Sequence, residues 1–196
     1  MTRIAAIALA LAAGAAWAGK YNAKLSIGDA GPSFKGLPAT DGKEYGLDDF
    51  KGKELVVLAV TCNHCPYAID YEDRLIALAK KYEGKVAVVA LSVGLGKEDR
   101  MDKMKERAKK KGFPFVYAHD ETQAIGRALG AVATPEFVVL DKARKVAYLG
   151  ALDDDDDPAK VKEKHLENAL DALLAGKKPT VAETRAIGCA IEYKKK

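Results

Sequence analysis

Apolar and polar positions follow two different periods along the chain, and this pattern predicts strands that alternate with helices. Two continuous apolar runs, ELVVLAV over 54–60 and KVAVVALSV over 85–93, have the length and β-branched content of buried strands. Between them, apolar residues recur every three or four positions, which predicts an amphipathic helix ending at Gly84. The apolar stripe of this helix consists of Ala68, Tyr71, Leu75, Leu78 and Tyr82.

The rest of the chain continues the alternation. Its predicted elements are a charged helix over 97–111, a strand over 113–118, a helix over 121–129 and a hairpin of strands over 136–141 and 145–152. A last helix is predicted to begin at Pro158, which suits a first turn, and to end at Gly176. Near the N-terminus, Asp41-Gly42 predicts a further hairpin. Together these elements predict an α/β sandwich whose mixed central sheet is flanked by helices.

The chain has 196 residues, 48% hydrophobic and 31% charged, which suits one domain with a substantial core. Residues 1–18 stand apart, because a short positive start precedes an apolar run over 4–16 and a small-x-small pattern ends at Ala18. We therefore predict a signal peptide over 1–18, a domain over 19–176 and a docked C-terminal tail over 177–196. An uncleaved anchor is the alternative, although the apolar run is shorter than the about 20 residues that span a bilayer.

The leader predicts a periplasmic or secreted protein, with no membrane span after cleavage, in a compartment where disulfides persist. The formal net charge of +4 is spread along the chain, so nothing indicates a nucleic-acid partner. The acidic run Asp153–Asp157 is predicted to be a solvated loop whose last members cap the helix at Pro158. Calcium binding is the alternative, but it needs alternating ligands and a distant bidentate glutamate.

The stretch TCNHCPY, residues 61–67, carries the candidate chemistry in Cys62 and Cys65. Structural zinc would need a second pair of ligands, and a structural disulfide closing so short a loop would stabilise the fold weakly. A redox-active dithiol is favoured, because the pair lies where a strand gives way to a helix. We expect Cys62 at the helix N-terminus, where unpaired N–H groups lower the thiol pKa. Cys62 would attack a disulfide, Cys65 would resolve the mixed disulfide, and His64 would tune the pair.

Several longer segments resemble the thioredoxin superfamily and, within it, the redoxin branch that includes AhpC/TSA and TlpA-like proteins. The segments are GDAGPSFKGLPATDGKEYGLDDFKGKELVVL, TCNHCPYAIDYEDRLIAL, YAHDETQAIGRALGAVATPEFVVLD, YLGALDD and GCAIEYK. More narrowly, they resemble bacterial thioredoxin-like proteins with a C-N-H-C-P-Y site, over residues 25–193. The resemblance implies a thioredoxin-like three-layer sandwich with an N-terminal hairpin extension.

The same resemblance implies roles for further residues. Thr134-Pro135 matches the cis-proline loop that faces the dithiol in this fold, and with Asn63 it would shape the substrate groove. The implied activity is thiol–disulfide exchange with protein or small thiol substrates and an upstream electron donor or acceptor. No organic cofactor is expected, because the dithiol holds the electrons.

Two other activities remain as alternatives. The first is a thiol-dependent peroxidase, although the chain lacks the proline-containing peroxide loop that peroxiredoxins carry before the nucleophile, as VVLAVTC shows. The second is a copper carrier in which His119 joins the reduced cysteines. The third cysteine, Cys189, lies in the apolar segment AIGCAIEY. It is interpreted either as a small buried hydrophobic residue of the docked tail or as a third redox thiol that pairs with Cys62.

Overall fold

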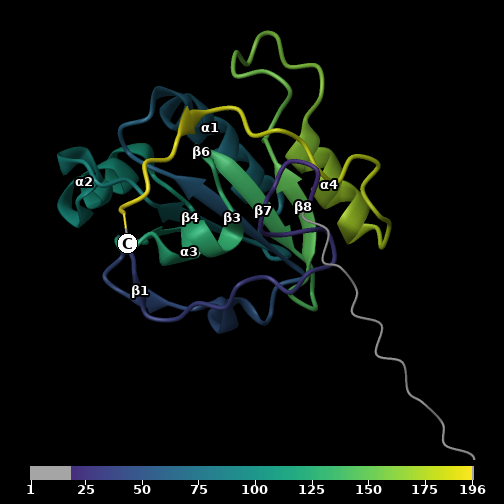
Figure 1. Ribbon diagram of the computed structural model, residues 1–196, viewed down its shortest axis with the longest axis horizontal. Helices are drawn as coiled ribbons and strands as arrows, with labels where there is room; N and C mark the ends of the chain where they lie inside the picture. The colour runs from purple at the N-terminus through teal and green to yellow at the C-terminus, as the bar shows by residue number, and fades with distance from the viewer. Residues whose placement is uncertain (1–18, 196) are drawn as a thin grey trace, which may run out of the picture.

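A computed structural model describes residues 19–195, and its centre is a five-stranded sheet with the strand order β5-β4-β3-β7-β8 (Figure 1). The strands are β3 (Leu55–Thr61), β4 (Val86–Ser92), β5 (Val116–His119), β7 (Glu136–Leu140) and β8 (Val146–Gly150). The β3–β4 and β4–β5 pairs are parallel, whereas the β3–β7 and β7–β8 pairs are antiparallel. The sheet is therefore mixed, as the sequence predicts. The predicted signal peptide lies outside the described residues.

Helices cover both faces of this sheet and make it the middle of three layers (Figure 1). The helices are α1 (Pro66–Lys81), α2 (Met101–Lys111), α3 (Ala124–Leu129) and α4 (His165–Leu174). The side chains of α1, α2 and α4 share one apolar cluster with Val57 and Ala59, and α3 shares the opposite cluster with Val56 and Leu58. Successive residues of β3 thus point to opposite faces, so a continuous apolar run is buried on both sides.

Two pairs of short strands lie outside the main sheet. The predicted N-terminal hairpin is confirmed: β1 (Leu37–Pro38) pairs antiparallel with β2 (Glu44–Tyr45). Gly42 has φ +85° in the turn, a conformation that favours glycine. A one-turn 3-10 helix, η1 (Leu47–Phe50), follows. The second pair joins β6 (Ala133–Thr134) to β9 (Cys189–Ala190), which lies in the C-terminal tail.

Two helices begin later than the sequence predicts, because carboxylates bind the backbone at their starts. The helix expected from residue 97 is split into the 3-10 helix η2 (Lys97–Asp99) and α2, with Arg100 extended between them. Asp99 turns its carboxylate back to the N–H of Gly96. In the next helix the carboxylate of Asp120 accepts N–H groups that include that of Ala124, so α3 begins there.

The helix predicted to begin at Pro158 begins at His165 instead, so this prediction is wrong. Arg74 of α1 holds the preceding acidic loop, since its guanidinium lies 2.7 Å from the carboxylate of Asp153 and 2.6 Å from the carbonyl oxygen of Asp156. Asp153 is buried, which corrects the expectation of a fully solvated run. The loop therefore packs against α1 and delays the helix by about two turns.

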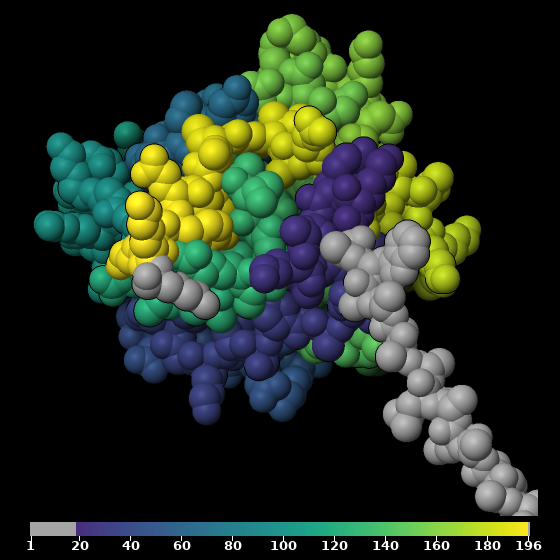
Figure 2. Space-filling view, in the orientation of Figure 1, coloured from purple at the N-terminus to yellow at the C-terminus, as the bar shows by residue number. Residues whose placement is uncertain are grey.

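The C-terminal tail, yellow in Figures 1 and 2, lies along the surface of the domain rather than away from it. Leu149 of β8 exchanges backbone hydrogen bonds with Ala182 and Thr184. Near the end of the tail, the Tyr193 hydroxyl donates to the carbonyl oxygen of Ala131 at 2.7 Å. Among the helices in residues 19–195, none has the length and apolar character needed to cross a bilayer.

Candidate active site

Cys65, rather than Cys62, occupies the N-cap of α1, which corrects the sequence prediction. Pro66 is the first residue of the helix, where its missing N–H costs nothing. A residue that precedes proline is disfavoured in the helical region, and Cys65 is accordingly extended, with φ −72° and ψ 121°. The helix therefore cannot continue back to Cys62, which directly follows the last residue of β3.

Burial raises the pKa of the Cys62 thiol, opposite to the predicted direction. The side chain is only 6% exposed, and desolvation disfavours the thiolate. The contact with Thr134, whose Oγ1 lies 3.5 Å from Sγ, lowers the pKa but does not compensate, and the negative charge of Asp99 raises it further. Cys62 therefore needs a base to react at neutral pH.

The pKa of the Cys65 thiol is lowered, in contrast to that of Cys62. Burial opposes its ionisation, but the contact with Cys189 and the backbone N–H of Ala68 are among the interactions that lower the pKa by more. Ala68 is the third residue of α1, so its N–H is one of the unpaired donors at a helix start. The expected stabilisation of a thiolate thus applies to Cys65, which is almost fully buried.

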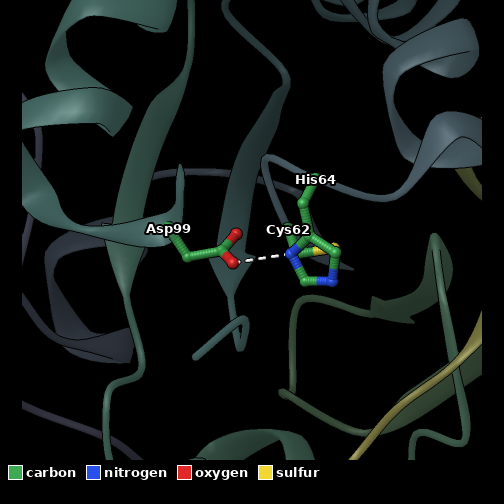
Figure 3. A group of neighbouring side chains, drawn as sticks. All are labelled: Cys62, His64 and Asp99. Carbon is green, nitrogen blue, oxygen red and sulfur yellow. Dashed lines mark hydrogen bonds and ion pairs between the residues drawn. The ribbon is translucent and has the colours of Figure 1, made fainter. Parts of the chain in front are cut away.

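His64 is the candidate base for Cys62, because its imidazole lies against both the sulfur and a buried carboxylate (Figure 3). His64 Nδ1 is 2.6 Å from Asp99 Oδ2, and His64 Nε2 is 4.0 Å from Cys62 Sγ. A proton on Nδ1 would pair with the carboxylate and leave Nε2 free to accept a proton. A base that is itself held by an acid is a combination that activates weak nucleophiles.

Backbone and side-chain contacts fix Asp99 and Asn63 in place. Asp99 is 1% exposed, and its Oδ1 accepts the N–H of Asn63 at 2.7 Å. The amide of Asn63 donates to the carbonyl oxygen of Glu98 and accepts from the Tyr117 hydroxyl. Asn63 therefore braces the loop. A Cβ on Gly94 would lie 2.1 Å from the Asp99 carboxyl carbon, so the carboxylate requires glycine there.

Cys62 opens into a cleft of about 520 Å³. One wall comes from the loop over 93–98 and the other from the tail over 189–192, with Cys62, His64 and Thr134 between them. The Thr134–Pro135 peptide is cis. Thr134 contacts the sulfurs of both cysteines, through Oγ1 at 3.5 Å from Cys62 Sγ and through its carbonyl oxygen at 3.1 Å from Cys65 Sγ.

Asp99 is the site residue that sequence reasoning missed, because the charge pattern around it predicts a helix. Its position could have been inferred from the order of the strands. β3 and β4 are parallel neighbours, so the segment after β4, which contains Asp99, lies at the same edge of the sheet as the cysteines after β3. Within residues 19–195, Cys62, His64 and Asp99 form the one group of three side chains close enough to share a metal ion. His119, the predicted copper ligand, lies outside that group.

Comparisons with known proteins agree with this architecture. A conserved protein of uncharacterised function from Geobacillus kaustophilus has a TM-score of 0.80 and 34% identity over 86% of this chain and 93% of that chain. A hypothetical protein from Sinorhizobium meliloti has a TM-score of 0.80 and 29% identity over 87% of this chain and 96% of that chain. A putative thiol:disulfide interchange protein DsbE from Chlorobium tepidum has a TM-score of 0.60 and 21% identity over 78% of this chain and 97% of that chain. Among curated proteins, none matches significantly.

These structures confirm the predicted thioredoxin-like three-layer sandwich. The sequence pattern of the Redoxin family matches residues 26–170, a stretch that contains the five central strands, the dithiol and the cis-proline loop. That stretch is well over half of the 196 residues, and the chain therefore belongs to the redoxin family.

Proposed function

We propose that this protein is a periplasmic or secreted thiol–disulfide oxidoreductase that uses Cys62 and Cys65 as its redox pair. The observation that carries the proposal is the cluster of Asp99, His64 and Cys62 beside the cleft, whose polar atoms lie within 4.8 Å of one another, with Cys65 packed against Cys62. A buried thiol with a raised pKa has no structural need for an oriented imidazole, but a nucleophile does. The leader over residues 1–18 supports the proposed compartment.

The first step joins Cys62 to the substrate. His64 Nε2 takes the thiol proton, and Cys62 Sγ attacks one sulfur of a substrate disulfide, R–S–S–R′. The S–S bond breaks, R′–S⁻ leaves with the electron pair, and a Cys62–S–S–R mixed disulfide remains. The 4.0 Å contact between His64 and Cys62 must shorten when substrate arrives, as catalytic hydrogen bonds often do.

The second step releases the substrate. The Cys65 thiolate attacks Cys62 Sγ, the second substrate thiolate leaves, and a Cys62–Cys65 disulfide forms. The substrate disulfide has then gained two electrons, and the dithiol has lost them. The lowered pKa of Cys65 favours its attacking thiolate form, and its burial keeps it from external disulfides. Access to solvent thus makes Cys62 the entry point, although Cys65 is the more acidic thiol.

Replacing Cys65 with serine tests this order of events. The variant keeps Cys62 and His64 but has no resolving sulfur at the N-cap, so we expect a mixed disulfide to accumulate on Cys62. The measurement is the intact mass of the protein after mixing with glutathione disulfide, followed by peptide mapping. Wild-type protein should show little of this adduct at the same time points.

Serine can still cap α1, so the variant should keep its fold, which circular dichroism checks. Hydrogen peroxide replaces glutathione disulfide in a parallel reaction, and preferential consumption of peroxide by the wild type would favour the peroxidase alternative. If Cys65→Ser carried glutathione on Cys189 instead of Cys62, the proposed entry point would be wrong.

A further inference from the structure

The third cysteine faces the resolving thiol and not the nucleophile. Cys189 Sγ lies 2.7 Å from Cys65 Sγ, which corrects the expected pairing of Cys189 with Cys62. A disulfide bond measures about 2.05 Å, so the two sulfurs are nearly in bonding range without rearrangement of the backbone. The three sulfurs belong to one small apolar cluster that also includes Ala68 and Tyr67.

The tail holds Cys189 in this position through backbone pairing. In the β6–β9 pair, Cys189 lies opposite Thr134, the residue whose carbonyl oxygen contacts Cys65. A Cβ on Gly188 would lie 2.1 Å from that carbonyl oxygen, so the tail approaches the cis-proline loop as closely as a backbone can. Beyond the strand, the Ile191 N–H donates to the carbonyl oxygen of Val132.

The position of β9 also decides which chains can pair with the loop. An unpaired strand edge next to a reactive sulfur is open to an extended peptide, which adds to it by backbone hydrogen bonds. Here β9 already fills the edge of β6, and it places a cysteine of the same chain against Cys65. The tail therefore occupies the place that an incoming cysteine-containing strand would take.

We propose that Cys189 is the final thiol of an internal relay, which rests on the proposed exchange activity of Cys62 and Cys65. After substrate has been released, the Cys189 thiolate attacks Cys65 Sγ. The Cys62–Cys65 bond breaks, the electron pair leaves with Cys62 Sγ, and a Cys65–Cys189 disulfide forms. The proton lost by Cys189 balances the one that returns to Cys62, so the step is an isomerisation with no net redox change.

The acidity of Cys189 changes in the direction that the relay needs. In the reduced protein, burial and the contact with Cys65, which favours the protonated thiol, together raise the pKa of Cys189 to about 11. Once Cys65 is part of a disulfide it carries no negative charge, and that contribution disappears. Cys189 thus becomes easier to ionise once the Cys62–Cys65 disulfide, its target, has formed.

The relay leaves Cys62 as a free thiol, while the disulfide is held between Cys65 and Cys189.

Peptide mapping of the wild-type protein tests the relay. The protein without its leader is reduced, treated with one equivalent of glutathione disulfide, quenched in acid at intervals and alkylated. We expect a Cys62–Cys65 linkage at early times and a Cys65–Cys189 linkage with alkylated Cys62 at equilibrium. Raising the pH should speed the conversion, because Cys189 attacks as the thiolate.

The outcomes separate the two proposals. A Cys62–Cys65 linkage that persists at equilibrium, with Cys189 fully alkylated, overturns the relay and leaves the exchange activity standing. A Cys62 that never reacts with glutathione disulfide overturns both.

Gly188→Ala gives an independent test, because its methyl group would collide with the Thr134 carbonyl and push the tail strand away. We expect the equilibrium amount of the Cys65–Cys189 linkage to fall by about 10-fold, since disulfide formation tolerates little displacement. Gly52→Ala is the matched control, as its Cβ would meet nothing within 4 Å. An unchanged Cys65–Cys189 linkage in Gly188→Ala would mean that β9 does not position the thiol.

Discussion

Replacing Cys62 with serine is expected to reduce the rate of disulfide exchange at least about 1,000-fold, because the attacking sulfur is lost. Cys65 is the more acidic thiol, but it is almost fully buried and lies behind Cys62. Cys189 has a raised pKa and contacts Cys65, so it is a poor substitute at neutral pH. The measurement is reduction of glutathione disulfide by the reduced protein under single-turnover conditions.

The loss of exchange rate in Cys62→Ser shows whether solvent access or acidity decides which thiol attacks the substrate. If acidity decided which thiol reacts, Cys62→Ser would retain most of the exchange rate and Cys65→Ser would lose it. Ile27→Ser is a suitable control, because Ile27 is exposed and does not line the cleft. Equal thermal unfolding of both variants and wild type would show that the loss is chemical and not a loss of folded protein.

Asp99→Asn is expected to slow exchange at neutral pH by about 100-fold, the size of a general-base contribution. An amide at this place donates to His64 Nδ1 instead of accepting from it. The imidazole would then carry its proton on Nε2 and point an N–H at Cys62, so it could not take the thiol proton. In the proposed reaction Asp99 orients His64 and makes no hydrogen bond to the reacting sulfurs, so it is a positioning residue.

A pH profile tests this role. As the pH approaches the raised pKa of Cys62, the thiolate forms without a base. The difference in exchange rate between Asp99→Asn and wild type should therefore shrink as the pH rises. A variant that merely disturbed the fold would lose activity equally at every pH. Asp102→Asn is the matched control, since Asp102 is an exposed acid three residues further along. An Asp99→Asn profile parallel to that of wild type would exclude His64 as the base.

The central strands and α1 were predictable because local sequence determines them. The apolar run of β3 is buried on both faces, and the apolar stripe of α1 packs on one of them. Helix starts were less predictable, since distant groups decide them. Asp120 fixes the start of α3, and Arg74 holds the loop that delays α4. Such contacts depend on the assembled fold and leave no periodic pattern in the sequence.

In the candidate site too, the residues that are close in sequence were predictable and the distant one was not. Cys62, His64 and Cys65 lie within four consecutive residues, and their spacing indicated redox chemistry. Asp99 is 35 residues from His64, and only the parallel pairing of β3 with β4 brings them together. The pKa order of the two thiols also eluded prediction, because it depends on the burial of Cys62 and on the contacts of Cys65 with the distant residues Cys189 and Thr134.

The docked tail has a consequence for biosynthesis. Cys189 and one wall of the cleft are translated after every strand of the main sheet, and Cys189 meets a sulfur 124 positions earlier in the chain. A nascent polypeptide therefore lacks the complete centre even when its sheet has formed. Completion of the candidate site is tied to synthesis of the tail.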